Sequence, residues 1–295
     1  MESLRILEED NGLLFYLSVI FGWIYFFAWS ISFYGQVIEN HRRASVSGLN
    51  FDFEIYNLVG FTTYTIYNIR GYIDDNLGTG TVQIQDIFFG SHALLLTIVT
   101  LIQILYYYDP KDKLQTVSNI TITIILVMIW GAILLVIVES GLEYYDPHVK
   151  EDRKYIFNSL VYMGWCKVFI SLIKYIPQVI SNYQRKSTIG WNIHNILLDF
   201  TGGAFSFGQN IVDTFRDEFS VTSEGQPKGL NIAKFALSFI SMFFDIIFMT
   251  QHYILYKDSN TDMEERQQEK KIQKEDKLSK LMESRESRES RDSEN

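Results

Sequence analysis

A segment of this sequence occurs twice, 142 positions apart, and both copies lie in long apolar stretches. Tyr34–Asn40 matches Ile176–Asn182, and the register continues without a gap until Asn57 falls on Asp199. An internal duplication in a membrane chain is typical of transporters whose substrate site lies between the two copies. The repeat therefore predicts two related halves with a site between them.

Seven stretches are long and apolar enough to cross a bilayer. A hydrocarbon core of about 30 Å needs about 20 mostly apolar residues in a helix. Such stretches occupy residues 13–37, 51–70, 87–108, 117–138, 155–179, 191–212 and 231–255. We therefore predict an all-α membrane protein with seven transmembrane helices.

The two copies begin at the first and fifth spans. Four spans separate them, so both halves point the same way and form parallel repeats. We expect two three-helix bundles, spans 1–3 and 5–7, joined by a linker helix 4. The predicted divisions are 1–11 (short luminal N-terminus), 12–108 (first bundle), 109–153 (linker helix with its loops), 154–256 (second bundle) and 257–295 (tail).

Charges in the loops predict the orientation. Lys and Arg collect in cytosolic loops, and they follow the first, third and fifth spans, as Arg42, Arg43, Lys111, Lys113, Arg185 and Lys186. The other three loops are acidic on balance, with Asp74, Asp75, Glu143, Asp146, Glu151, Asp152, Asp213, Asp217, Glu218 and Glu224. The N-terminus is expected outside or in a lumen, and the C-terminus in the cytosol.

The tail from Lys257 is polar, mixed in charge and repetitive. Such a segment buries too little apolar surface to fold alone. We expect a disordered or partly helical cytosolic extension, a candidate binding segment for sorting or signalling proteins.

Several function classes find no support in the sequence. There is no basic nucleic-acid recognition element, no nucleophile–base pair for an enzyme, and no His/Cys set with metal-ligand spacing. The single cysteine, Cys166, cannot form an intramolecular disulfide and is expected to be a small packing residue.

Ionisable residues inside spans are costly, and they mark substrate or proton pathways. Here they are Asp199, Asp245, Lys167, Lys174 and, at a span boundary, Asp86. Helical spacing and the repeat predict a site for a zwitterion lined by Asn57, Asp199, Asn195 and Lys167. Where the halves differ, as at Asn57 against Asp199, one half is neutral and the other charged.

Other interpretations of these residues stay open. Asp199 and Lys167 could simply neutralise each other. Lys174 lies near the end of its span and could extend to the interface. Asp86 could be an ordinary boundary residue.

A hinge is predicted where the repeat carries its glutamines. Pro177 removes a backbone hydrogen bond and kinks a helix, and Gln178 can bond the groups that the kink frees. In the first copy, Gly35 precedes Gln36, so that bend is softer and not obligatory. The predicted hinge or gating residues are Gly35, Gln36, Lys174, Pro177 and Gln178. Static helix geometry is the alternative interpretation.

Several motifs resemble those of the cystinosin family of PQ-loop transporters. They are Gly22–Tyr34 followed by Gln36-Val37-Ile38, Lys174–Gln178, Leu197–Gly203, Asp86–Phe89 before His92, and Phe244-Asp245 with Gln251-His252. The resemblance covers roughly residues 20–257. Two departures are Gly35 in place of a proline and the absence of a large glycosylated luminal region before the first span.

The resemblance implies export of cystine, together with protons, from the lysosome or an equivalent acidic vacuole to the cytosol. It implies proton coupling at Asp199, Asp245 and Asp86, and adds Trp23 to the pocket residues. No cofactor is expected besides the coupling protons, and the implied partners are L-cystine and membrane lipid. The alternatives are an exporter of lysine, arginine or another small solute with the same fold, and a seven-span receptor.

Overall fold

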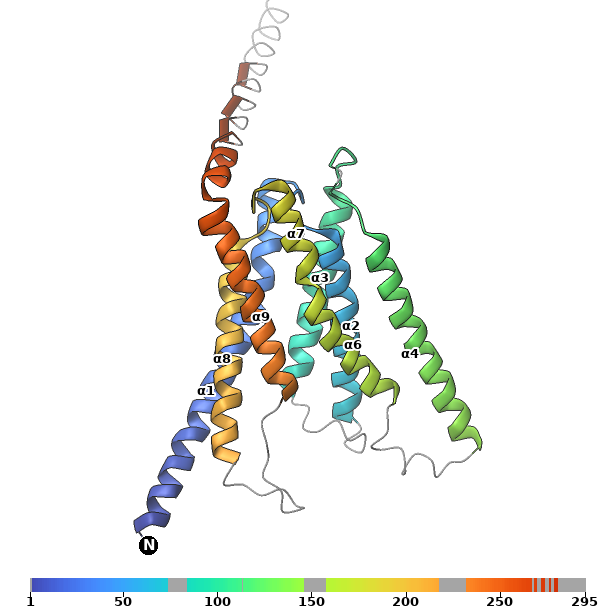
Figure 1. The fold of residues 1–295 in the computed structure, drawn as a ribbon, viewed down its shortest axis with the longest axis vertical. Coiled ribbons are helices and arrows are strands. Elements are labelled where there is room, and N and C mark those ends of the chain that lie inside the picture. Colours follow the sequence, from blue (N-terminus) through green and yellow to red (C-terminus); the bar gives the residue numbers. More distant parts are fainter. Residues whose placement is uncertain are drawn as a thin grey trace, which may run out of the picture.

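The computed structural model describes residues 2–73, 84–112, 114–145, 158–217 and 232–266, with short pieces between 268 and 280. Within these residues every regular element is helical (Figure 1). The elements are α1 (Glu2–Arg43), α2 (Phe51–Ile73), α3 (Ile84–Tyr106), α4 (Asn119–Tyr145), α6 (Ser159–Ile173), α7 (Tyr175–Arg185), α8 (Ile193–Asp217), α9 (Ile232–Thr250) and the π-helical turn η2 (Gln251–Leu255).

Within the described residues, each of the seven apolar stretches is helical over most of its length. The fifth stretch is divided into α6 and α7, and α1 begins at Glu2, well ahead of the expected start. Among the described residues, five helical segments are long and apolar enough to cross a membrane: Gly12–Arg43, Ile87–Tyr106, Asn119–Leu142, Ser159–Arg185 and Ser238–Leu255. Together they make the chain a helical membrane protein. α2 and α8 fall outside this group because they carry polar residues along their inner faces.

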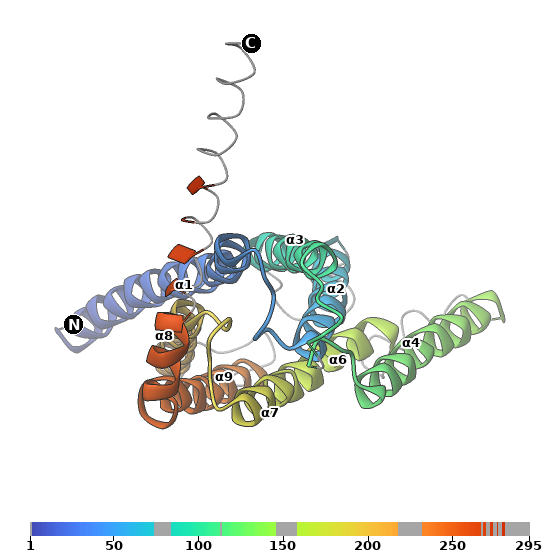
Figure 2. The same ribbon diagram turned by 90° about the horizontal axis from the view of Figure 1, so that it is seen from above.

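The helices form a ring when the molecule is seen from above (Figure 2). α3 packs against α1 and α2, and α9 packs against α8 and α6. The two sets meet where α1 lies along α8 and where α2 lies along α6. The two interfaces are equivalent to each other in the sequence repeat, because α1 corresponds to α6 with α7 and α2 corresponds to α8. The ring therefore has approximate two-fold symmetry. α4 lies outside the ring against α2 and α6.

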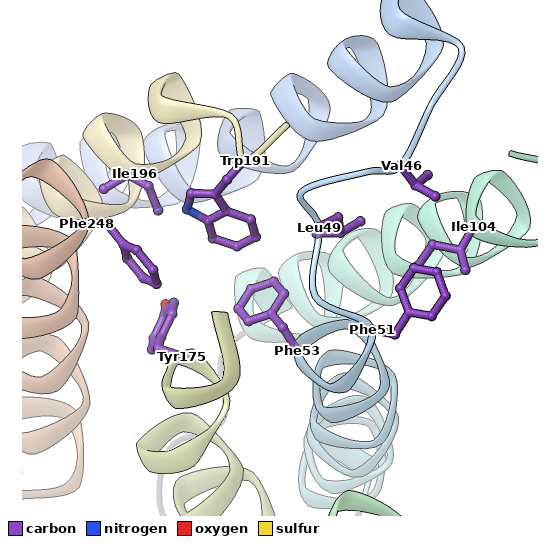
Figure 3. Packing of buried hydrophobic residues seen from close by; sticks show 9 residues of the cluster. All are labelled: Val46, Leu49, Phe51, Phe53, Ile104, Tyr175, Trp191, Ile196 and Phe248. Atoms are coloured by element: carbon purple, nitrogen blue, oxygen red, sulfur yellow. The ribbon is translucent and has the colours of Figure 1, made fainter. Parts of the chain in front are cut away.

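One end of the ring is closed by the connections 44–50 and 186–192, which we call the crossed loops. Aromatic and aliphatic side chains from both halves pack beneath them (Figure 3). These core residues are Val46, Leu49, Phe51, Phe53, Ile104, Tyr175, Trp191, Ile196 and Phe248. Phe53 and Trp191 meet edge to face, with ring centroids 4.8 Å apart, and so join the two halves.

Cys166 belongs to a smaller cluster between the ring and α4. It is 5% exposed and packs with Tyr56, Met128 and Ile170. The packing role expected for this cysteine is therefore present in the structure.

The first part of the tail is helical over 257–266 and contacts the crossed loop 186–192. The Asn260 side chain accepts hydrogen bonds from Ser187 Oγ (2.8 Å) and Thr188 N (3.0 Å), and donates to Thr188 Oγ1 (2.8 Å). The acidic segments 74–83, 146–157 and 218–231 lie outside the described residues, so the structure does not test the loop-charge pattern there.

Candidate functional site

A cavity of about 70 Å³ lies inside the ring, below the crossed loops. That volume accommodates several water molecules. Its walls combine aromatic rings with polar side chains from both halves of the repeat. The lining residues are Ser32, Phe33, Gln36, Phe53, Glu54, Asn57, Thr97, Thr100, Lys174, Tyr175, Trp191, Asn195, Ile196 and Asp199.

The carboxylate of Asp199 is held on one wall by hydroxyl groups. Its Oδ2 accepts from Tyr175 Oη at 2.6 Å and from Ser241 Oγ at 3.1 Å. The indole of Trp29 donates to the Asp199 backbone carbonyl at 3.2 Å, which ties α8 to α1. Asn57, the repeat equivalent of Asp199, also lines the cavity. The structure thus brings this predicted pair to one cavity.

Lys174 supplies a positive charge to the same cavity. Its ammonium donates to Asn57 Oδ1 at 3.3 Å and lies 4.5 Å from the centroid of the Tyr175 ring. The side chain is 9% exposed, so it points into the protein instead of extending to the interface.

Lys167 is not one of the residues that line the cavity. Its ammonium sits 4.0 Å from the centroid of the Phe61 ring, a cation–π contact. Among the described residues, no ion pair joins Lys167 to Asp199. Asn195 lines the cavity one turn before Asp199, with its Oδ1 pressed against Gly35.

Asp245 lies behind the cavity wall, fully buried. It is 0% exposed, and neither carboxylate oxygen has a hydrogen-bond partner among the described residues. Asp199 and Lys174 are its electrostatic neighbours. Asp86 lies in the first turn of α3, and its side chain is outside the described part of the structure.

Trp23 does not line this cavity. It is 49% exposed on α1 and stacks on Phe27, with ring centroids 5.7 Å apart. Nine of the fourteen lining residues were not predicted as site residues from the sequence, and Tyr175 and Glu54 are among them. Tyr175 follows Lys174 directly, and Glu54 is an acidic residue inside an apolar stretch, so both carried a detectable signal.

The repeated glutamines join the two halves at the crossed loops. Gln36 donates to Gly190 O at 2.9 Å and accepts from Asn192 N at 3.0 Å. Gln178 makes the equivalent pair, donating to Gly48 O at 2.9 Å and accepting from Asn50 N at 2.7 Å.

A second layer of amides supports each glutamine from within its own half. Gln36 donates to Asn40 (2.8 Å), and Asn40 donates to Gln103 (3.0 Å). In the other half, Gln178 donates to Asn182 (2.9 Å), and Asn182 donates to Gln251 (3.0 Å). Gln103 and Gln251 are 148 positions apart, not 142, so a fixed sequence register does not pair them.

Two glycines allow the crossed loops to touch. Gly48 and Gly190 have φ values of 106° and 94°, a region that favours glycine. A Cβ on Gly48 would strike Ile189 O, and one on Gly190 would strike Ser47 O. The backbones are therefore in direct contact, which closes this end of the ring.

The helix carrying Pro177 is interrupted, whereas the one carrying Gly35 is not. The break between α6 and α7 falls at Lys174, next to Ile173, the residue whose carbonyl loses its bond to the proline nitrogen. α1 runs unbroken through Gly35. A Cβ at Gly35 would meet the side-chain oxygens of Asn192 and Asn195, so a proline at this position would require both side chains to shift.

The arrangement can hold a small molecule that carries both charges. It offers carboxylate, ammonium, amide and hydroxyl groups between aromatic walls, at the junction of two related halves. Among the described residues, no group of three or more His, Cys, Asp or Glu could hold a metal ion.

Comparisons with known proteins agree with this organisation. The PQ loop repeat family model matches residues 17–77 and 160–219, one match in each half. Cystinosin of Drosophila melanogaster is 37% identical over 265 residues, which cover 86% of this chain and 62% of the fly protein. The chain thus spans about three fifths of that relative.

Shorter relatives are covered almost completely. A cystinosin homolog of Arabidopsis thaliana is 40% identical over 250 residues, 81% of this chain and 86% of the plant protein. A protein of Saccharomyces cerevisiae named cystine transporter is 29% identical over 261 residues, 84% of this chain and 96% of the yeast protein. These names describe transporters and not enzymes, in agreement with the sequence analysis. With a PQ loop repeat in each half and such identity over most of its length, this chain belongs to the cystinosin family.

Proposed function

We propose that this chain is a seven-span transporter that exports cystine, together with protons, from an acidic lysosome or vacuole to the cytosol. The observation that carries the proposal is the charged cavity between the two halves, below the crossed loops. A site at the junction of two repeats is where transporters of this architecture bind their substrates.

The proposed membrane arrangement follows from the repeat and the contacts. α1–α3 form one bundle, α6–α9 with η2 form the other, and α4 links them. The equivalent hydrogen bonds of Gln36 and Gln178 at the same end support parallel halves. Arg42, Arg43 and Lys186 lie at this end, so we assign it to the cytosol. The N-terminus is then luminal.

The chemistry of the cavity supports an amino-acid substrate. Lys174 can bind a carboxylate, Asp199 can bind an ammonium group, and the Asn57 amide can serve either. Cystine carries two of each charged group, and relatives of this chain are named for cystine and cystinosin.

Asp245 supports the proton-coupling part of the proposal. An ionised carboxylate without hydrogen bonds is costly inside a protein, so we infer that Asp245 holds a proton in this conformation. Its neighbour Asp199 is then free to bind substrate. Neutralising these carboxylates lowers the cost of moving the loaded site past apolar surfaces.

The transport cycle is proposed to use alternating access. With the crossed loops in contact, substrate leaves to the cytosol only after Gln36 and Gln178 release their partners. The break before Pro177 is the proposed hinge. Substrate enters from the opposite, luminal end.

Flux measurement in proteoliposomes tests the proposal. Purified protein should take up labelled cystine when the substrate side is acidic, and unlabelled cystine should compete better than lysine or arginine. Asp199→Asn should reduce uptake at least tenfold or remove its pH dependence. Asp213→Asn, on the same helix but outside the cavity lining, is the matched control.

Three results would contradict the proposal. Normal, equally pH-dependent uptake by Asp199→Asn would reject the coupling role. Stronger competition by lysine or arginine would reassign the substrate. Ligand binding without any flux would favour a receptor.

A further inference from the structure

Glu54 is a carboxylate of the cavity that the proposed mechanism does not use. It lies in the first turn of α2, is 5% exposed and lines the cavity. A glutamate is rarely buried to this extent unless it is paired.

The contacts of Glu54 connect it to the charged centre of the cavity. Its carboxylate interacts with the Asn57 side chain, which lines the same cavity. The Asn57 carbonyl oxygen accepts a hydrogen bond from the Lys174 ammonium at 3.3 Å. Asn57 therefore connects Glu54 to the ammonium group of the cavity.

Lys174 cannot account for Glu54 by itself. This ammonium interacts electrostatically with three carboxylates, those of Asp199, Asp245 and Glu54. A second ammonium group, that of Lys167, interacts with Asp199. The two ammonium groups together offset two of the three carboxylates, and one unit of negative charge is left for a proton or for a cationic group that enters the cavity.

The repeat shows where that charge lies. The repeat equivalent of Asp199 on α8 is the neutral Asn57 on α2. The first half therefore has no carboxylate at this position of the repeat. Glu54 stands three residues before Asn57, on the same face of α2. Its own equivalent on α8 is the apolar Ile196. Each half thus contributes one carboxylate to the cavity, although at different positions of the repeat.

Cystine is itself two-fold symmetric, with an ammonium and a carboxylate at each end of a disulfide. We propose that Glu54 is a specificity-determining residue that binds the second ammonium group of this ligand, while Asp199 binds the first. The inference rests on the proposed function, because it assigns the second end of the same substrate. It makes the site selective for ligands with an ammonium group at both ends.

A pair of ligands isolates the proposed contact. The mixed disulfide of cysteine with 3-mercaptopropionate is cystine without one ammonium group, and it adds no bulk. Unlabelled cystine and the unlabelled mixed disulfide each compete with labelled cystine for uptake into proteoliposomes. Charge-assisted hydrogen bonds contribute enough that wild-type protein should prefer cystine about tenfold or more.

The preference should depend on Glu54. In Glu54→Gln the two ligands should compete within about twofold of each other, because the acidic partner of the second ammonium is gone. Glu54→Asp, which keeps the carboxylate, should restore part of the preference. Glu264→Gln, in the exposed tail helix, should retain all of it.

Several outcomes overturn the inference. An undiminished preference in Glu54→Gln would show that Glu54 only balances Lys174. If wild-type protein transports cystine but does not prefer it over the mixed disulfide, the inference is rejected, even if Glu54→Gln fails to fold. Wild-type protein without cystine flux would reject the proposed function itself, and the inference with it.

Discussion

Replacing Gln178 with alanine should open the crossed loops. The side chain is fully buried and makes two hydrogen bonds to the other half, to Gly48 O at 2.9 Å and from Asn50 N at 2.7 Å. Alanine removes both bonds and leaves two backbone groups without these partners. These bonds exist only while the loops touch, so their loss destabilises the closed arrangement selectively.

The size of the effect follows from the two bonds. Each buried group left unpaired costs about 1–3 kcal/mol, and a typical bond contributes about 1 kcal/mol net. We expect a loss of about 2–4 kcal/mol in the free energy that favours closure. Since 1.4 kcal/mol is tenfold, the ratio of closed to open molecules should fall by roughly 30- to 700-fold.

Spin-label distances measure this ratio. Positions 42 and 184 are exposed and equivalent in the repeat, and they flank the two crossed loops. Labels go on cysteines there after replacement of the buried Cys166 by alanine. Gln178→Ala should add a population with longer distances between the labels. This population should be present even in a sample without cystine.

Gln103→Ala is the matched control. Gln103 bonds Asn40 Nδ2 and Val37 O, both within its own half. Its removal should lower stability without changing the distance between the loops. An unchanged distribution in Gln178→Ala, or an equal shift in Gln103→Ala, would refute the reasoning.

Two further predictions concern helix packing and the tail. Gly202→Ala places a methyl group against the Trp29 indole and should lower stability by about 1–3 kcal/mol, seen as a lower Tm in detergent. Gly141→Ala, with nothing within 4 Å of the added carbon, should leave Tm unchanged, and equal losses would contradict the packing argument. Asn260→Ala removes three hydrogen bonds to the crossed loop that contains Thr188, and should speed amide exchange over 257–266 at least about tenfold. Unchanged exchange would mean that other contacts hold this helix.

The positions of the helices were predictable because hydrophobicity is a local property. Within the described residues, each apolar stretch is helical over most of its length, and Pro177 accounts for the break at Lys174. The register of the repeat also predicted that Asn57 and Asp199 would meet at one cavity, since equivalent helices face each other across a pseudo-two-fold axis.

The identity of several contacts could not be predicted in this way. Side-chain direction depends on helix rotation, which spacing alone does not give. Lys167 was expected in the site but lies over Phe61, whereas Lys174 reaches Asn57. Trp23 was assigned to the pocket by resemblance, and the structure places it half exposed on α1.

The sequence by itself determined that this chain is a duplicated helical membrane protein, because apolar length and repeat register are properties of the linear chain. Only the tertiary structure decided which polar groups share the cavity and how the halves join. Glu54 and Ile196 are equivalent in the repeat yet chemically unlike, and Gln103 and Gln251 are alike yet out of register. Whether such groups become partners depends on the distances across the ring. These distances are set by the packing of all the helices, and the residue spacing within one helix does not give them.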